Sequence, residues 1–495
     1  MKKKETFINI AIFVIYILLQ IFLAIHHEAW RDESQAWIIA RNASFGEILG
    51  LCASEGHPCL WFFILKILSL CGFSFYWFSA ISITIMSVAA ALFLWKCPFP
   101  TVLKVFVLLS PVFFYYNPVI CRIYAVLALL IVVLCIIWPD RKDHPVGYGI
   151  IVALLFQSHI LIAGFAMGCL IEMLIRREDT FNNKKGILGF AVSAISMLCM
   201  IAELKQNNKT ETYIHVTPGL LLSHADAVSQ NIKTVTSKFD IGGYRTGKII
   251  LLLCSIMIIV FIAKIVLDLS LRKKRKDILI VFLCGLLYYW GIIVFVRGAG
   301  HVQMAGVFWM IMLFFVWTTT YAADNTGFFR MNIYELLFLV CCVLVIPRSA
   351  WIDPVADIKG QFSGSLEMAT IVDETVPDKS IIVIRNNELS TSIASYLYES
   401  EKNYTIWDID NGCEFQIHKW GRENKRNVQD DVIVETAYKD CGKKEGCYYI
   451  NATTSIDPEQ LQSGKITLIK KNTSPNTWDE YYQLYKLSNV VDSNG

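Results

Sequence analysis

Long apolar runs, repeated over most of the first 350 residues, constrain the fold of this chain more than any other feature. About eleven of them approach the ~20 residues that cross a bilayer as a helix, and a few are shorter. They cover residues 7–25, 75–95, 102–116, 120–138, 146–157, 160–175, 187–204, 249–271, 278–296, 302–321 and 333–347. The 495 residues are 55% apolar, with a mean hydropathy of +0.47. This is too hydrophobic for a soluble globular protein, so we predict an α-helical polytopic membrane protein with about eleven transmembrane helices plus interfacial helices.

Basic residues predict how these spans are oriented. Lys and Arg gather in alternate loops, at residues 2–4, 96–104, 141–142, 176–185 and 272–276. Placing these loops in the cytoplasm satisfies the positive-inside rule. We therefore predict a protein of the cell membrane with a cytoplasmic amino terminus, a retained anchor at residues 7–25 and an extracytoplasmic carboxy-terminal part. The short apolar segment 57–70 would break the alternation if it crossed, so we predict an interfacial or re-entrant helix there.

The first outer loop, residues 26–72, begins with an acidic pair at the membrane surface. Asp32 and Glu33 lie in the stretch WRDESQAWIIAR, directly after the first apolar run. Carboxylates beside a membrane are costly to desolvate, which favours a chemical or ion-binding role over packing. Helical spacing of the apolar residues from Ala36 to Ala43 predicts an interfacial helix, and Ser44 with Glu47 predicts a capping box that opens a second helix over residues 45–53.

The composition changes after Trp351, which predicts two domains. Residues 1–350 would form the transmembrane catalytic module, and residues 351–495 an extracytoplasmic α/β domain. Helices are expected at residues 366–376 and 391–399. Strands are expected at residues 380–384, 404–408, 432–434, 448–450, 466–469 and 481–487.

Polar residues from separate loops are predicted to meet at the outer end of the bundle. Arg122 and Arg297 suit a phosphate group, because a planar guanidinium donates two parallel hydrogen bonds. Asp32 suits a general base that takes a proton from an acceptor hydroxyl. The other candidates are acids, histidines and a tyrosine that would orient Asp32, bind a cation or hold substrate: Glu33, Glu55, His57, Tyr124 and His301.

Simpler interpretations stay open for several of these residues. Asp32 would also serve as a helix N-cap. Arg122 and Arg297 would also be expected where long side chains snorkel to a membrane surface. His159, in a short outer loop, is best explained as a structural histidine with satisfied ring nitrogens.

The first outer loop resembles that of the GT-C superfamily of integral-membrane glycosyltransferases. Its closest likeness is to the branch of the protein O-mannosyltransferases and the bacterial lipid A aminoarabinose transferases. The resemblance is carried by the Asp-Glu pair, by Ile39-Ala40-Arg41 at the end of the following helix, and by His57-Pro58-Cys59-Leu60, which is similar to the His-Pro-Pro-Leu of the mannosyltransferases. It covers the amino-terminal third of the chain well, whereas the middle spans match in hydropathy alone.

The resemblance implies that Asp32 is the catalytic base and that the donor is a polyprenyl-phosphate sugar bound by arginines of the outer leaflet. Many members of the superfamily carry an acidic residue in the second outer loop. The corresponding stretch here, residues 117–124, has Arg122 and no acid. No cofactor is therefore assigned, and the use of a divalent cation is left open.

The main functional hypothesis is a transferase that moves a sugar from polyprenyl phosphate to an extracytoplasmic glycan, lipid or protein. Its partners would be the lipid bilayer, the donor and that acceptor. A formal net charge of +3 argues against nucleic acid. The alternatives are a transporter or flippase of lipid-linked glycans, which would place polar residues near the middle of several spans, and a non-catalytic membrane scaffold.

Overall fold

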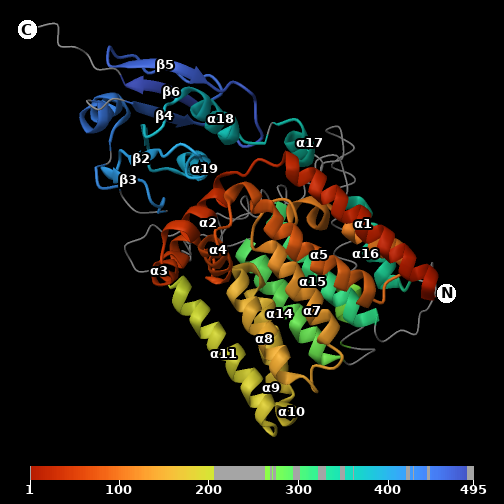
Figure 1. Ribbon diagram of the computed structural model, residues 1–495. Helices are drawn as coiled ribbons and strands as arrows, with labels where there is room; N and C mark the ends of the chain where they lie inside the picture. The colour runs from red at the N-terminus through yellow and green to blue at the C-terminus, as the bar shows by residue number, and fades with distance from the viewer. Residues whose placement is uncertain are drawn as a thin grey trace, which may run out of the picture.

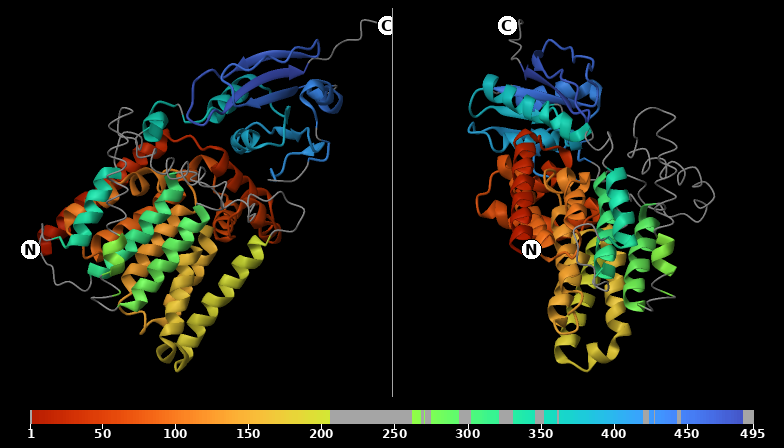
Figure 2. Two further views of the ribbon diagram at one scale, coloured as in Figure 1. Left: turned by 180° about the vertical axis from the view of Figure 1, so that it is seen from behind. Right: turned by 90° about the vertical axis from the view of Figure 1, so that its right-hand side faces the viewer.

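The computed structural model describes residues 2–205, 262–267, 270, 275–293, 302–320, 331–345, 352–360, 362–419, 424–426, 428–442 and 446–487. The described residues form a helical part, with a sheet at one end of it (Figure 1). Views from behind and from the side show the same arrangement (Figure 2). Arg297 and His301 lie outside the described residues, as does most of the segment 205–248.

The helical part follows the apolar runs of the sequence. Its α-helices are α1 (Lys2–His26), α2 (Arg31–Asn42), α3 (Phe45–Glu55), α4 (Leu60–Leu70), α5 (Phe78–Lys96), α6 (Thr101–Leu108), α7 (Tyr124–Ile137), α8 (Pro145–Ser158), α9 (Ala163–Ile175), α10 (Arg177–Phe181), α11 (Lys184–Leu204), α14 (Lys276–Ile292), α15 (Val302–Thr320) and α16 (Ile333–Val345). Short 3₁₀-helices η1 (Phe75–Trp77) and η3 (Ile160–Ile162) precede α5 and α9.

Membrane-crossing length is reached by three helices among the described residues: Lys4–His26, Phe75–Lys96 and Lys184–Leu204. Other apolar helices are shorter, among them Tyr124–Ile137, Pro145–Ser158 and Gly306–Thr320. The structure therefore confirms a helical chain with apolar helices that suit a membrane and a C-terminal sheet. The count of eleven spans and their orientation stay predictions.

Two apolar runs fold differently from a single helix. The run 102–116 divides into α6 and a π-helix, η2 (Val112–Tyr116), and the run 120–138 becomes helical only at Tyr124. Proline cannot donate a backbone hydrogen bond, and Pro111 and Pro118 interrupt the helical pattern here. The intervening residues 117–123 include Arg122, which forms an ion pair with Asp32 of α2.

The first outer loop forms the short helices that its sequence predicts. Ser44 accepts from the backbone N–H of Glu47, and Glu47 accepts from that of Ser44, which confirms the capping box at the start of α3. Helix α2 packs on α4 on one side and on helix α19 (Glu388–Leu397) of the sheet region on the other. Two of its polar residues, Gln35 and Asn42, donate to backbone carbonyls of the carboxy-terminal part, those of His418 and Gln416.

A six-stranded mixed sheet organises the carboxy-terminal part. Its strands are β1 (Ile381–Ile384), β2 (Thr405–Asp408), β3 (Cys413–Glu414), β4 (Cys447–Thr453), β5 (Ile466–Lys471) and β6 (Tyr481–Leu487), in the order β3-β2-β1-β4-β6-β5. Strands β2, β1 and β4 are parallel, β3 and β6 pair antiparallel with β2 and β4, and β5 pairs antiparallel with β6. Besides α19, the helices of this part are α17 (Ile352–Ile358), α18 (Ser365–Thr375), α20 (Ile433–Ala437), the 3₁₀-helix η7 (Asp430–Val432) and the π-helix η8 (Tyr438–Gly442).

Both faces of the sheet are covered, as an α/β arrangement requires. Along β1, Ile382 and Ile384 join an apolar cluster with α18 and α19, whereas Val383 joins a second cluster with α20. The strand predicted at residues 432–434 is wrong, because these residues belong to η7 and α20. Ile433 of α20 is buried in the second cluster, whereas Val432 is exposed, so the three-residue apolar run belongs to a helical turn that buries one side.

Glycine lets α8 and α11 cross in close contact. A Cβ built at Gly149 of α8 would lie 2.2 Å from the carbonyl oxygen of Gly189 in α11, whereas one at Gly147 meets nothing within 4 Å. Ser193 of α11 also donates to the carbonyl of Gly149, at 3.0 Å. Small residues at a crossing let two backbones approach in this way in membranes.

We expect Gly149→Ala to force the two helices apart and to lower the free energy of unfolding by about 1–3 kcal/mol, the usual cost of overpacking. Gly147→Ala, two residues away in the same helix, should be neutral or stabilising by up to ~1 kcal/mol, because alanine favours a helix. Thermal unfolding in detergent, followed by circular dichroism, measures both. Equal midpoints for the two variants would contradict the close crossing.

Candidate functional site

Asp32 and Arg122 form an ion pair at the end of the helical part that faces the sheet. Asp32 lies in the first turn of α2, where the helix dipole favours a negative charge. Its Oδ2 is 3.0 Å from Nη1 of Arg122, and the two side chains are 24% and 10% exposed. The structure thus brings together two residues that the sequence predicted to meet, 90 positions apart, and leaves part of the carboxylate open to solvent.

Arg122 is held from a second direction by α15. Its Nη1 donates to Oε1 of Gln303 at 3.3 Å, and Nε2 of Gln303 donates to the carbonyl of Tyr116 at 2.6 Å. Burial alone would lower the pKa of Arg122, but the carboxylates of Asp32, Glu33 and Glu55 raise it above its ordinary value. The guanidinium is therefore a permanent positive charge surrounded by the predicted acids of the first outer loop.

Glu33 is fully buried, and its oxygens accept hydrogen bonds from protein groups. Oε1 accepts from the backbone N–H of Cys121 at 2.6 Å, and Oε2 accepts from the backbone N–H of Trp30 at 3.4 Å. Oε2 also lies 3.0 Å from Nε2 of His27. Glu33 therefore caps α2 and holds the turn before Arg122.

The other predicted residues that the structure describes fall into two groups. Tyr124 Oη is 3.1 Å from Nε2 of His159, and the ring of His159 is 4.8 Å from that of His57, centroid to centroid. The backbone N–H of Leu161 donates to Nδ1 of His159 at 3.0 Å, so this histidine is neutral and carries its proton on Nε2. This agrees with a structural role for His159.

Glu55 belongs to the second group, at the contact with the carboxy-terminal part. Its Oε1 accepts from Nε2 of Gln35 at 2.9 Å, and the same nitrogen donates to the carbonyl of His418 at 2.7 Å. Burial lowers the pKa of His418 to about 4, so its ring is neutral here. The charge of Glu55 thus acts on Arg122, and Gln35 links Glu55 to the sheet region by hydrogen bonds.

The carboxy-terminal part contacts the segment that leads into α2. Trp30 stacks on Trp478 with ring centroids 3.9 Å apart, and Arg31 forms a 2.9 Å ion pair with Glu388 of α19. Glu480 accepts from Ser363 Oγ at 2.6 Å and from the backbone N–H of Arg31 at 3.4 Å.

Glu28 and Glu480 are acids buried in this contact. Burial raises the pKa of each to about 7, against the lowering effect of a hydrogen bond from Ser363. A carboxyl group with such a pKa is partly protonated at neutral pH, which reduces the cost of enclosing two acids in one contact.

Several residues of this site escaped the sequence prediction. Gln303 is a polar residue in an apolar run, a signal that would have found it. His27 gave a weaker signal, since a histidine at a membrane surface is equally well explained as an interfacial residue. Asp357, which binds His27, lies 330 positions away in α17, and its local sequence carries no signal of this contact.

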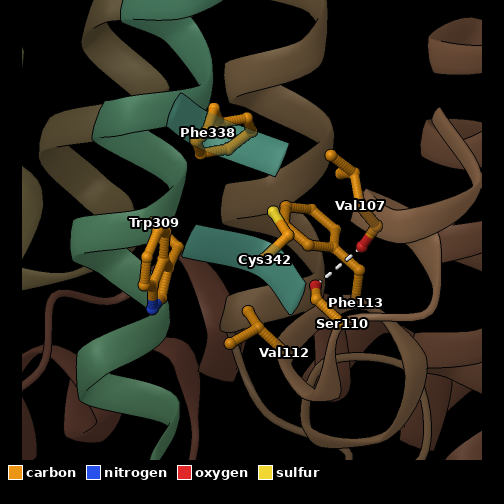
Figure 3. A pocket seen from close by; sticks show the side chains of 7 residues that line it. All are labelled: Val107, Ser110, Val112, Phe113, Trp309, Phe338 and Cys342. Atoms are coloured by element: carbon orange, nitrogen blue, oxygen red, sulfur yellow. Dashed lines mark hydrogen bonds between the residues drawn. The ribbon is translucent and has the colours of Figure 1, made fainter. Parts of the chain in front are cut away.

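A small apolar cavity lies elsewhere in the helical part, between α6, η2, α15 and α16 (Figure 3). Its volume is about 10 Å³, room for about one water molecule. Figure 3 shows Ser110 turned back onto the carbonyl of Val107, at 2.6 Å. This cavity is too small for a sugar or a phosphate group. Its lining residues are Val107, Ser110, Val112, Phe113, Trp309, Phe338 and Cys342.

Within the described residues, no group of three or more His, Cys, Asp or Glu side chains is arranged to hold a metal ion. The use of a divalent cation therefore stays open. No family model matches the chain, and neither the curated proteins nor the solved structures contain a significant match to it.

Proposed function

We propose that the chain is a membrane glycosyltransferase that moves a sugar from a polyprenyl-phosphate donor to an extracytoplasmic acceptor. The observation that carries the proposal is the 3.0 Å ion pair between Asp32 and Arg122 at the end of the apolar helices. A lipid-linked donor keeps its tail in the bilayer and its phosphate at the surface. A cation near membrane depth and a carboxylate beside it are the two groups that such a donor and its acceptor require.

Arg122 would bind the phosphate of the donor. Without donor, Asp32 is the counter-ion of Arg122, and a phosphate group offers the guanidinium a stronger bidentate partner. Donor binding would therefore draw Arg122 away from Asp32 while Gln303 keeps hold of the guanidinium. The acid is thus released when the donor is present.

Asp32 would act as the general base. Freed from Arg122, its carboxylate takes the proton of the acceptor hydroxyl as the hydroxyl oxygen attacks the anomeric carbon. The bond from that carbon to the phosphate oxygen breaks, and the leaving polyprenyl phosphate is an anion that needs no added proton. One base suffices, and the expected stereochemical outcome is inversion.

The experiment is a transfer assay in proteoliposomes with radiolabelled polyprenyl-phosphate sugars, tried one at a time. Transfer of label to an acceptor supports the proposal. Movement of the lipid-linked sugar between leaflets without transfer would support the transporter instead, and neither activity with any donor would favour the scaffold.

For the donor site, we expect Arg122→Gln to weaken donor binding about 10- to 100-fold, the loss of one or two charged hydrogen bonds. Binding isotherms with the donor measure this directly. Lys66→Gln is the matched control, because it also removes one positive charge. Lys66 lies on α4 and donates to the carbonyl of Arg41, so it is not part of the Asp32–Arg122 pair. Equal affinities in both variants and the wild type would exclude Arg122 from the phosphate site.

A further inference from the structure

Glu33 is linked to both residues of the Asp32–Arg122 ion pair through the backbone. It follows Asp32 in α2, and its Oε1 accepts the N–H of Cys121, the residue before Arg122, at 2.6 Å. One buried carboxylate therefore ties together the two backbone segments that carry the ion pair. We therefore expect a movement of Glu33 to change the distance between Asp32 and Arg122.

His27 and Asp357 hold Glu33 in turn. Nε2 of His27 is 3.0 Å from Oε2 of Glu33, and Nδ1 of the same ring is 2.8 Å from Oδ2 of Asp357. Asp357 also accepts from the hydroxyl of Tyr115 and from the backbone N–H of Glu28, the latter at 3.4 Å. Both carboxylates and the imidazole are buried, with side chains 0–1% exposed.

We propose that Asp357, His27 and Glu33 form a positioning triad that sets the separation of Asp32 and Arg122 and so couples the carboxy-terminal part to the reactive pair. The triad spans α17, the end of α1 and the start of α2. Its effect on transfer rests on the proposed function, whereas its effect on the two backbone segments does not.

The triad requires a doubly protonated imidazole. Each ring nitrogen of His27 faces a carboxylate oxygen, so with both acids ionised each nitrogen must carry a hydrogen to make its bond. The other titratable groups around His27 also favour its positively charged form. Glu33, Asp357 and the nearby Glu28 and Tyr115 add no competing positive charge, and the two carboxylates raise the pKa of His27 well above its ordinary value although burial opposes this.

The first test is hydrogen exchange, which needs no substrate. In His27→Gln and in Asp357→Asn we expect amides of residues 31–36 and 119–125 to exchange about 10- to 100-fold faster, because Glu33 loses its anchor. Asp353→Asn is the matched control. Asp353 lies one turn from Asp357 on α17 and accepts from Tyr116 Oη at 2.9 Å, the counterpart of the Tyr115 contact. It should leave both segments protected.

A transfer assay on the same variants then reads the coupling. We expect kcat to fall in His27→Gln and Asp357→Asn with little change in donor KM, and neither value to change in Asp353→Asn. If the wild type transfers no sugar, the exchange result still decides on the triad. If only one of the two segments loses protection, or if Asp353→Asn has the same effect, the triad is excluded.

The ionisation of His27 gives an independent check on the unmodified protein. The chain has nine histidines, so a spectrum of ¹⁵N-histidine-labelled protein is simple enough to assign with His27→Gln. We expect both ring nitrogens of His27 to carry hydrogen at pH 7 and at pH 8. An unprotonated ring nitrogen at pH 7 would overturn the proposal, even if a variant failed to fold.

Discussion

Replacing Asp32 by asparagine is expected to lower the rate of sugar transfer by about 10²- to 10⁴-fold, the usual contribution of a general base. Asparagine keeps the shape of the side chain and loses its ability to take a proton. The charge left behind, on the buried guanidinium of Arg122, keeps its hydrogen bond to Gln303 and stays near the charges of Glu33 and Glu55. The fold should therefore survive.

The same substitution should not weaken donor binding. In the wild type, Asp32 competes with a phosphate group for the guanidinium of Arg122, whereas asparagine competes less because it carries no charge. We expect the donor affinity of Asp32→Asn to equal or exceed that of the wild type while kcat falls. A fall in kcat without a fall in donor affinity distinguishes a base from a residue that only maintains the fold, because damage to the fold would reduce both quantities.

Steady-state kinetics with the donor identified in the transfer assay measure both quantities. Asp457→Asn is a charge-matched control, since Asp457 lies on the surface and pairs with Lys471. Full activity of Asp32→Asn would rule out the mechanism. A loss of donor affinity larger than the loss of kcat would assign Asp32 to binding instead.

Glu172→Gln is expected to have the largest effect on stability, a loss of about 3–5 kcal/mol, because it removes one partner from a buried ion network. Glu172 of α9 is fully buried. Its oxygens accept from Arg141 at 2.9 Å, from Arg176 at 3.0 Å and from Tyr148 at 3.2 Å. Arg141 also pairs with Asp277 of α14 at 2.8 Å. Because Tyr148 belongs to α8, the network joins α8, α9 and α14.

Thermal unfolding in detergent measures this loss, and the ion pair of Lys142 with Asp179 supplies a control from the same end of the bundle. Those side chains are 53% and 44% exposed, and exposed pairs contribute at most about 1 kcal/mol. Lys142→Gln, which leaves the 3.8 Å pair of Asp179 with Arg176 in place, should therefore unfold near the wild-type temperature. Similar midpoints for Glu172→Gln and Lys142→Gln would show that the buried network does not stabilise the bundle.

The helices could be predicted where the apolar run is long and its helical periodicity is clear. Within the described residues, most of the apolar runs form helices, and the capping box at Ser44 and five of the six predicted strands appear in the structure. The errors fall where the local signal is short. Residues 432–434 are β-branched but too few to distinguish a strand from a buried helical turn, and two prolines divide the region around residues 111–118 in ways that hydropathy does not register.

The candidate site could be predicted in part for a related reason. Asp32 and Arg122 are charged residues at the ends of apolar runs, and the alternation of basic loops predicts such ends on one side of a membrane. The predicted topology was therefore enough to expect them near each other. It does not specify their 3.0 Å contact, nor the hold of Gln303 on the guanidinium, because those depend on how α2, α7 and α15 pack.

By itself, the sequence determined the apolar helices, the short helices after the first run and the place of an acidic pair directly after an apolar helix, since each depends on residues close together in the chain. The tertiary structure alone decided what Glu33 contacts. Its partners come from residues 88 positions away and, through His27, from a helix 330 positions away. Contacts between residues so far apart in the chain form only when the chain folds. They bury Glu33, whereas its neighbour Asp32 remains 24% exposed.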